Sequence, residues 1–233
     1  LAYVTLSKTS DDVPRSSIYE MSGAPISALK SLEKKGIIEL FDKEVSRLDF
    51  EESEGDLPSL SDEQVKALAS IKDHFEEEKV TLLHGVTGSG KTRVYMELIK
   101  EVMQQGKQTL YLLPEIALTT QIVSRLQHIF GEDVAVFHSR LNNHERVELY
   151  KEAMHDKKII LGARSALFLP FNNLGLIIVD EEHDPSFKQN DPNPRYNARD
   201  AAVILGKITK SQVLLGTATP SLESYYNVKA DSY

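Results

Sequence analysis

Hydrophobic and polar positions follow two different periods from residue 61 onward. Short runs rich in Val, Ile and Leu alternate with longer segments in which apolar residues return every three or four positions. The first pattern predicts buried strands and the second predicts amphipathic helices. Strands are predicted over residues 80–84, 109–113, 134–137, 158–162, 176–180 and 212–216. Helices are predicted over residues 62–77, 91–105, 116–130, 143–155 and 198–208.

This alternation indicates the fold class. Helices of this length, one after nearly every strand, are long enough to cover both faces of a parallel sheet. We therefore expect an α/β fold with a doubly wound parallel sheet over residues 61–233. In such folds the ligand site lies at the carboxyl ends of the strands.

Residues 1–52 form a different pattern. Pro25 opens a short predicted helix, and Gly36 follows that helix as a stop signal. Two short strands, predicted over residues 37–41 and 45–50, complete the order of a small α+β winged-helix-like module, although its first helix is not obvious. Such modules often bind DNA through the second helix. A protein-contact or spacer role is the alternative.

The net charge of −8 is unevenly distributed. Residues 51–79 hold 10 Asp and Glu against 3 Lys and Arg, whereas residues 80–233 hold 17 of each. The protein therefore has no global positive field, and any phosphate contact must use a local basic patch. The acidic stretch over residues 53–60, with a glycine and a proline, predicts a linker between the two parts.

Composition narrows the class of protein further. The sequence has no cysteine, which excludes disulfides and thiolate zinc sites from this sequence. No apolar run approaches the roughly 20 residues that span a bilayer. The first residues lack the basic and apolar pattern of a secretory signal. We expect a cytoplasmic protein without a membrane partner.

Residues 85–92 read Gly-Val-Thr-Gly-Ser-Gly-Lys-Thr and match the phosphate-loop pattern at every fixed position. They follow a predicted strand and open a predicted helix, where backbone N–H groups and the helix start favour phosphate. Lys91 is expected to reach the outer phosphates, and Thr92 to offer its hydroxyl to Mg²⁺. The predicted ATP-binding residues here are Gly85, Thr87, Gly88, Ser89, Gly90, Lys91 and Thr92.

An acidic motif follows the apolar strand over residues 176–179. Asp180 is predicted to hold Mg²⁺ through water, and Glu181 to orient and deprotonate the water that attacks the γ-phosphate. Glu182 is expected in a solvated turn. His183 is expected to couple the γ-phosphate state to movement elsewhere, with a turn cap as the alternative. The phosphate loop and Asp180 are expected where two neighbouring strands end.

Seven segments occur in the order of superfamily 2 helicases, and the sequence most resembles the PriA family of bacterial primosomal replication-restart helicases. These segments cover residues 85–92, 114–119, 137–139, 162–166, 180–183, 195–200 and 216–220. The resemblance implies that residues 61–233 are a RecA-like first helicase lobe. It also implies a 3′-to-5′ DNA helicase that unwinds stalled or abandoned forks and initiates primosome assembly. Another superfamily 2 DNA translocase, acting in repair or recombination, is the alternative.

The resemblance also implies partners and residue roles. Single-stranded and forked DNA, single-stranded DNA-binding protein and primosome proteins would be partners, and the family carries a zinc element farther along its chain. Gln64 would read adenine, although it also fits a capping box that begins at Ser61. Thr217 and Thr219 would link hydrolysis to lobe movement. Residues implied to line the DNA track are Glu115, Thr119, His138, Ser139 and Arg164.

The segment over residues 184–200 interleaves aromatic and cationic residues: Phe187, Lys188, Arg195, Tyr196 and Arg199. Aromatic faces stack on exposed bases and cations hold phosphates, so we predict a DNA-sensing loop. In the alternative interpretation, the aromatic rings tuck into the core and the arginines pair with Asp191 and Asp200.

Two further classes stay open at this point. A small-molecule phosphotransferase would not need the segment over residues 216–220, and a non-enzymatic regulator would not need Lys91, Thr92, Asp180 and Glu181 intact. A helicase motor closes its nucleotide site with an arginine from a second lobe. We therefore expect the 233 residues alone to bind ATP or ADP weakly, to hydrolyse ATP slowly and to unwind nothing.

Overall fold

The computed structural model describes residues 26–37, 59–77, 80–114, 117, 120–138, 141–155 and 157–230. The chain divides into two compact units, Leu1–Asp49 and Phe50–Tyr233.

The first unit contains the helix α3 (Ile26–Lys34). Gly36 follows it with a φ of 66°, and its N–H donates to the carbonyl of Glu33 at 2.9 Å. The N–H of Ile37 donates to the carbonyl of Leu32 at 3.0 Å, which completes a left-handed cap on the helix. The predicted stop at Gly36 is confirmed. Beyond Ile37 the predicted strands lie outside the described residues, so the winged-helix module stays a prediction.

The second unit is built on a parallel sheet. Within the described residues its strands are β1 (Val80–His84), β2 (Gln108–Leu112), β3 (Val134–Phe137), β4 (Ile159–Gly162), β5 (Leu174–Asp180) and β6 (Gln212–Thr217). Every pairing is parallel, and the order is β1-β6-β5-β2-β4-β3. The predicted strands are present with ends shifted by at most two residues. The α/β fold with a doubly wound parallel sheet is confirmed.

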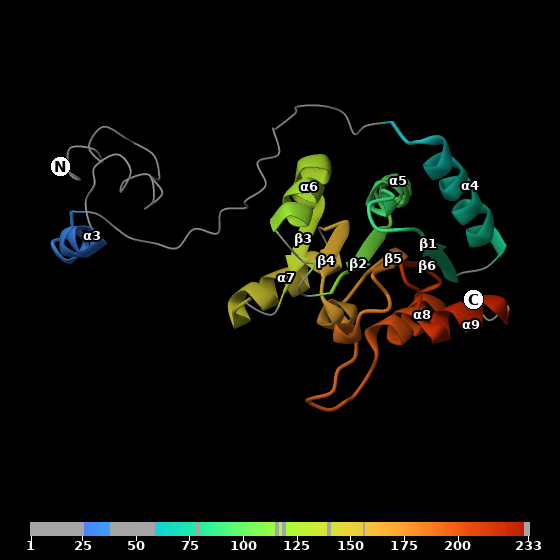
Figure 1. Cartoon of the computed structure of the whole chain (residues 1–233). Helices are drawn as coiled ribbons and strands as arrows, with labels where there is room; N and C mark the ends of the chain where they lie inside the picture. Colours follow the sequence, from blue (N-terminus) through green and yellow to red (C-terminus); the bar gives the residue numbers. More distant parts are fainter. Residues whose placement is uncertain are drawn as a thin grey trace. The chain divides into compact units, whose positions relative to one another are not determined.

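Helices cover both faces of this sheet (Figure 1). One face carries α4 (Asp62–Glu77), α5 (Lys91–Gln104) and α6 (Thr120–Phe130), and the other carries α7 (Asn143–His155) and α8 (Ala198–Thr209). The helix α9 (Leu222–Lys229), which the sequence did not predict, follows β6. Of the helix predicted over residues 116–130, residues 116, 118 and 119 lie outside the described ranges. No helix in the described ranges is long and apolar enough to cross a membrane.

The fully buried strand β5 shows how the sheet directs its side chains. Successive residues of a strand point to opposite faces. Leu176 and Ile178 accordingly belong to the hydrophobic core under α4, α5 and α6, whereas Ile177 and Val179 belong to the core under α7 and α8. By the same alternation Asp180 points to the α5 side.

The strand order corrects one expectation. The phosphate loop follows β1 and the acidic motif follows β5, but β6 lies between these two strands and pairs with both. The two motifs therefore end on strands separated by a third, not on neighbouring strands. No local pattern in the sequence reports this order, because each of the three strands is an apolar run.

Candidate nucleotide site

The loop between β1 and α5 has the backbone of a phosphate-binding turn. Gly88 and Gly90 have φ values of 78° and 79°, a left-handed conformation that glycine adopts without a steric penalty. Lys91 begins α5, and its ammonium donates to the carbonyl of Gly85 at 2.9 Å, so that the side chain folds back over the loop. The helix start adds free N–H groups and the positive end of the dipole. This loop fits a phosphate chain.

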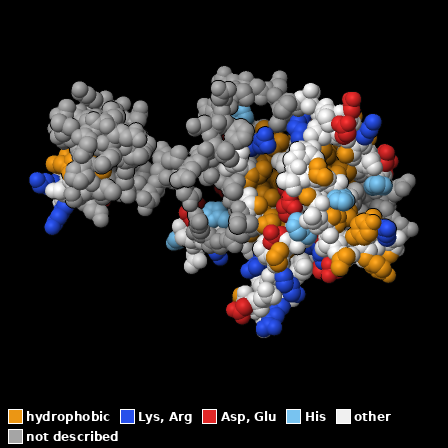
Figure 2. Space-filling view, viewed as in Figure 1, with side chains coloured by type: hydrophobic (Ala, Val, Ile, Leu, Met, Phe, Trp, Pro, Cys, Tyr) orange, Lys and Arg blue, Asp and Glu red, His pale blue; other side chains and the backbone are white. Residues whose placement is uncertain are grey.

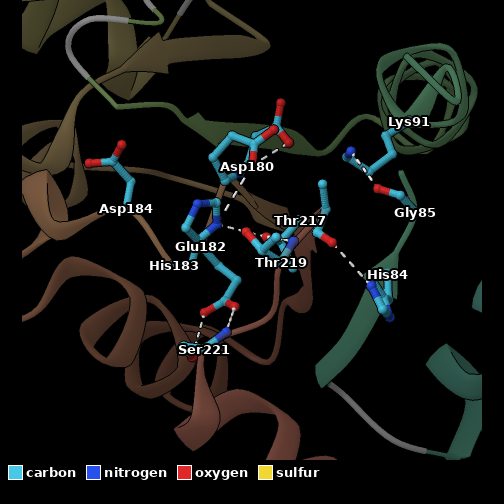
Figure 3. A network of polar contacts seen from close by, with 12 residues as sticks. His84, Gly85, Lys91, Asp180, Glu182, His183, Asp184, Thr217, Thr219 and Ser221 are labelled. Carbon is cyan, nitrogen blue, oxygen red and sulfur yellow. Dashed lines mark hydrogen bonds and ion pairs between the residues drawn. The ribbon is translucent and has the colours of Figure 1, made fainter. Parts of the chain in front are cut away.

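Asp180 lies at the same end of the sheet as Gly85 and Lys91 of the phosphate loop (Figure 3), and it accepts hydrogen bonds from two buried tyrosines. The hydroxyl of Tyr95 in α5 donates to Asp180 Oδ1 at 2.9 Å, and that of Tyr111 in β2 donates to Oδ2 at 3.1 Å. Because Lys91 opens α5, Tyr95 joins Asp180 directly to the helix that follows the phosphate loop.

A glycine in the intervening strand makes this approach possible. Gly216 of β6 pairs in register with Asp180. A Cβ atom at this position would lie 1.7 Å from the Tyr95 hydroxyl oxygen and 3.4 Å from Asp180 Oδ1. Any other residue at position 216 would therefore collide with the phenol that reaches Asp180 across β6.

The carboxylate of Asp180 is poorly compensated. Burial raises its pKa, the hydrogen bond from Tyr95 opposes this rise, and the nearby charge of Glu181 raises the pKa further. Burial, together with the charge of Asp180, also raises the pKa values of Tyr95 and Tyr111 well above the usual range. These partners are neutral hydroxyls, so they leave the negative charge available to a cation.

The oxygen ligands at this position suit Mg²⁺ bound together with a nucleotide. In the described part of the chain no group of three or more His, Cys, Asp or Glu residues could hold a metal by itself. Magnesium sites in nucleotide-binding proteins instead use one or two protein ligands together with phosphate oxygens and water. The hydroxyl of Thr92 and the carboxylate of Asp180 fit that requirement.

Glu181 has a strained backbone. Its φ is 51°, in the left-handed region where a residue other than glycine costs about 1–3 kcal/mol. Its N–H donates to Asp180 Oδ1 at 3.1 Å, and its side chain is about one third exposed. Strain of this kind clusters at functional positions, and the water-activating role of Glu181 stays a prediction.

A hydrogen-bond chain joins the ends of β5 and β6. His183 Nδ1 lies 2.8 Å from Thr217 Oγ1, and the N–H of Thr219 donates to the same oxygen at 3.1 Å. His84 at the end of β1 contacts the carbonyl of Ala218 at 3.1 Å rather than packing within its strand. The segment over residues 216–220 therefore contacts both the acidic motif and the strand before the phosphate loop, and coupling through His183 stays a prediction.

Glu182 does not occupy the solvated turn that the sequence suggested. It is only 2% exposed and accepts hydrogen bonds from the N–H and hydroxyl of Ser221, at 2.7 and 3.0 Å, and from the hydroxyl of Ser224 at 2.8 Å. Arg199 of α8 adds an ion pair at 3.2 Å. The expectation of a solvated turn was wrong. Glu182 is buried by partners 17 to 42 residues away in the sequence, which no local pattern reports.

Two members of the predicted DNA-sensing loop are not available at the surface. Phe187 is 1% exposed and packs in the core under α7 and α8, so its predicted stacking on bases is wrong. Arg199 is 6% exposed and pairs with Glu182 and Asp200, so it does not hold a phosphate. For both residues the alternative interpretation describes the structure, because burial of the ring and pairing of the guanidinium satisfy them internally.

The tip of this loop keeps its exposed polar character (Figure 2). Lys188 and Arg195 are exposed, and Tyr196 is half-buried with its ring edge-to-face against Phe168 at 5.0 Å. Arg164 donates to the carbonyls of Ser186 and Lys188, at 3.0 and 3.4 Å, and so braces the start of the loop. A DNA contact by Lys188, Arg195 or Tyr196 remains a prediction.

The remaining predicted residues divide into three groups. Gln64 forms the expected capping box, because its side-chain oxygen accepts from the N–H of Ser61 at 3.0 Å, and its amide also donates to the carbonyl of Ser89 at 3.1 Å. His138 has a buried Nδ1 without a hydrogen-bond partner among the described residues. Glu115, Thr119 and Ser139 lie outside the described residues.

Tyr95 and Tyr111, the phenol partners of Asp180, were not predicted as site residues, and Gly216 was predicted only as part of the segment over residues 216–220. The two tyrosines occupy positions that hydrophobic periodicity assigns to the core. A buried phenol needs a hydrogen-bond partner for its hydroxyl, and this requirement was the available signal that a polar group lies beside them.

The parallel sheet, the phosphate loop and the acidic motif define a nucleotide-binding lobe of the superfamily 2 helicase type. The sequence profile of the family described as "Type III restriction enzyme, res subunit" matches residues 57–222. The chain belongs to this family.

Curated relatives confirm the resemblance to PriA. The chain is 43% identical to Replication restart protein PriA of Chlamydia pneumoniae over 229 residues, which cover 94% of the chain and 30% of that protein. It is 40% identical to Replication restart protein PriA of Bacillus subtilis, over 95% of the chain and 28% of that protein. The chain thus spans less than a third of these relatives.

Solved structures agree with the fold. RecG bound to a three-way DNA junction is 26% identical, with a TM-score of 0.54, over 73% of the chain and 22% of that structure. The Pyrococcus furiosus Hef helicase domain is 20% identical, with a TM-score of 0.52, over 72% of the chain and 36% of that domain. The second likeness concerns the fold alone.

Proposed function

We propose that the chain is the ATP-binding lobe of an ATP-dependent DNA helicase that restarts replication. The proposed enzyme unwinds stalled or abandoned forks in the 3′-to-5′ direction and initiates primosome assembly. The observation that carries this proposal is the position of Asp180 at the phosphate-loop end of the sheet, where Tyr95 of the helix opened by Lys91 donates to it at 2.9 Å. The similarity to relatives named Replication restart protein PriA supports the proposed role in replication restart.

Each part of the site has a role in this proposal. The loop glycines, with Thr87, Ser89 and Lys91, hold the phosphates of ATP, and Thr92 and Asp180 hold Mg²⁺. The Mg²⁺ ion, when bound, neutralises charge on the transferred phosphoryl group. Glu181 orients the attacking water and accepts its proton. His183 passes the nucleotide state to Thr217, the residue it already contacts.

Gln64 reads adenine in this proposal, from a position beside the phosphate loop. Its amide now joins the capping box of α4 to the carbonyl of Ser89. These two bonds use one of its two oxygen lone pairs and one of its two N–H donors, so a donor and an acceptor are left for a base.

The proposed partners are single-stranded and forked DNA, with single-stranded DNA-binding protein and primosome proteins in the full-length protein. The proposed DNA contacts come from Glu115, Thr119, His138, Ser139, Arg164, Lys188, Arg195, Tyr196 and Thr219. We propose a cytoplasmic, nucleoid-associated protein. Zinc, if it is bound, belongs to the further length that the relatives have, because the present sequence has no cysteine.

The likeness to RecG favours a second candidate, a superfamily 2 DNA translocase acting on branched DNA in repair or recombination. Unwinding by the full-length protein separates the two. Forked substrates whose leading-strand end lies at the junction, or away from it, should be unwound at different rates by a replication-restart helicase. A Lys91→Ala variant supplies the matched control, because it should bind DNA but not unwind it. Equal rates on the two forks would favour the second candidate.

The chain of 233 residues makes a separate prediction. We propose that the arginine that completes the nucleotide site comes from the further length present in the relatives, where such arginines contribute about 10³ to 10⁵ in rate. The chain alone should bind ADP and hydrolyse ATP slowly. Rapid steady-state ATP turnover by the purified chain would contradict the proposed origin of this arginine.

A further inference from the structure

Two tyrosines enclose the carboxylate that the proposed function assigns to Mg²⁺. Tyr95 and Tyr111 are both fully buried, and they come from different elements, α5 and β2. Their rings pack edge-to-face, with centroids 5.7 Å apart and an interplanar angle of 79°. A phenol held in this way has little freedom to move, because protein cores are close-packed. Both hydroxyls therefore occupy fixed positions relative to the sheet.

The two hydroxyls fix the orientation of Asp180. Oδ1 accepts from Tyr95 and from the N–H of Glu181, and Oδ2 accepts from Tyr111. A carboxylate that accepts hydrogen bonds on both oxygens cannot rotate about its Cβ–Cγ bond without breaking one of them. Its two oxygens have about four lone-pair sites, and three hydrogen bonds leave capacity for a further ligand.

We propose that Tyr95 and Tyr111 are positioning residues that hold Asp180 in the orientation that binds Mg²⁺ with the nucleotide. This inference rests on the proposed function. A purely structural role, in which Asp180 only satisfies two buried phenols, would leave Mg²⁺ binding unchanged when a hydroxyl is removed. Removing a group that hydrogen-bonds to a metal ligand typically weakens metal affinity about 10- to 100-fold.

The test uses the 233-residue chain and a fluorescent ADP analogue, titrated in EDTA and then with increasing Mg²⁺. For Tyr95→Phe and Tyr111→Phe we expect nucleotide affinity in EDTA to stay within about twofold of wild type. The Mg²⁺ concentration that half-saturates the nucleotide complex should rise about tenfold. Tyr150→Phe is the matched control, because Tyr150 is an exposed tyrosine of α7 and should not change either value.

The outcomes separate the inference from the proposed function. A wild-type chain that binds no ADP overturns the proposed function and the inference with it. A wild-type chain that binds ADP in a Mg²⁺-dependent manner, with the same half-saturating Mg²⁺ in both phenylalanine variants, overturns the inference alone.

A second measurement avoids substitution, in case a variant does not fold. The wild-type chain labelled with 3-fluorotyrosine has nine tyrosines. When Mg²⁺ is added to the ADP complex, two fluorine resonances should shift, with the same half-saturation as the fluorescence titration. If no fluorine resonance shifts when Mg²⁺ is added, the proposal is overturned.

Discussion

Asp180 and Glu182 are both buried acids at the end of β5, yet their surroundings differ in charge. Asp180 faces α5 and accepts hydrogen bonds from neutral tyrosine hydroxyls, and burial raises its pKa. Glu182 faces α8 and α9 and has an arginine, two serine hydroxyls and a backbone N–H as partners. The charge of Glu182 is already compensated inside the protein, whereas that of Asp180 is left for a ligand. The comparison teaches that the charge of the partners, rather than burial, separates the structural acid Glu182 from Asp180, the proposed ligand-binding acid.

Glu182→Ala should have the largest effect on stability. It would leave the guanidinium of Arg199 without its buried partner, and breaking a buried ion pair in this way costs about 3–5 kcal/mol. The free energy of unfolding from urea denaturation measures this loss. Glu223→Ala is the control, because its carboxylate lies 3.9 Å from Arg199 with the side chain 72% exposed, and such pairs contribute about 1 kcal/mol or less. Equal losses in the two variants would contradict the claim that Arg199 depends on Glu182 as its buried partner.

Gly216→Ala tests the other side of the comparison. The added methyl group would overlap the Tyr95 hydroxyl, and overpacking of this kind typically costs about 1–3 kcal/mol. Removing that hydroxyl in the double variant with Tyr95→Phe should recover part of the loss. A double-mutant cycle in denaturant measures the coupling. Strictly additive effects would show that the phenol does not occupy the space at Gly216.

Asp180→Asn should stabilise the chain in the absence of ligand. Because burial raises the pKa of Asp180, the ionised carboxylate disfavours the folded state at neutral pH, and its removal should add on the order of 1 kcal/mol. The advantage should be present above the folded pKa and vanish below the usual carboxyl range, where wild-type Asp180 is protonated in both states. Thermal melts of both proteins from pH 4 to pH 8 test this sign. A lower melting temperature for Asp180→Asn at pH 7 would contradict it.

Glu97→Gln should have the smallest effect. Partial burial raises the pKa of Glu97, but the hydrogen bond and charge of Arg93 lower it below the usual value overall. The ion pair on the surface of α5 should contribute about 0.3–0.5 kcal/mol. Because the folded pKa is lowered, this contribution is present above the usual carboxyl pKa and is lost as pH falls through the folded value. Thermal melts of wild type and Glu97→Gln, at low and at high salt, should therefore differ in melting temperature at neutral pH only.

The fold followed from periodicity because each strand and helix has a local signal. The run from Leu176 to Val179 is apolar on both faces, as a strand covered on both sides requires. The phosphate loop was equally local, since Gly88 and Gly90 mark the turn by themselves. Local signals were sufficient wherever the interacting residues are close in sequence.

The parts that sequence reasoning missed depend on distant partners. The position of β6 between β1 and β5, the burial of Glu182 and the reach of Tyr95 to Asp180 all join residues from separate elements. Phe187 was misplaced for the same reason, because a ring in a loop looks exposed until the core beneath it is known. Tertiary contacts decide these cases.

Manganese binding tests the central claim most directly. With ADP in excess, the chain should bind one Mn²⁺ in a ternary complex, and electron paramagnetic resonance of the remaining free and ADP-bound metal measures this stoichiometry. The account predicts that Glu182→Gln keeps this site and that Asp180→Asn loses it. Full retention of the ternary site in Asp180→Asn, or its loss only in Glu182→Gln, would show that the ligand-binding charge had been assigned to the wrong acid.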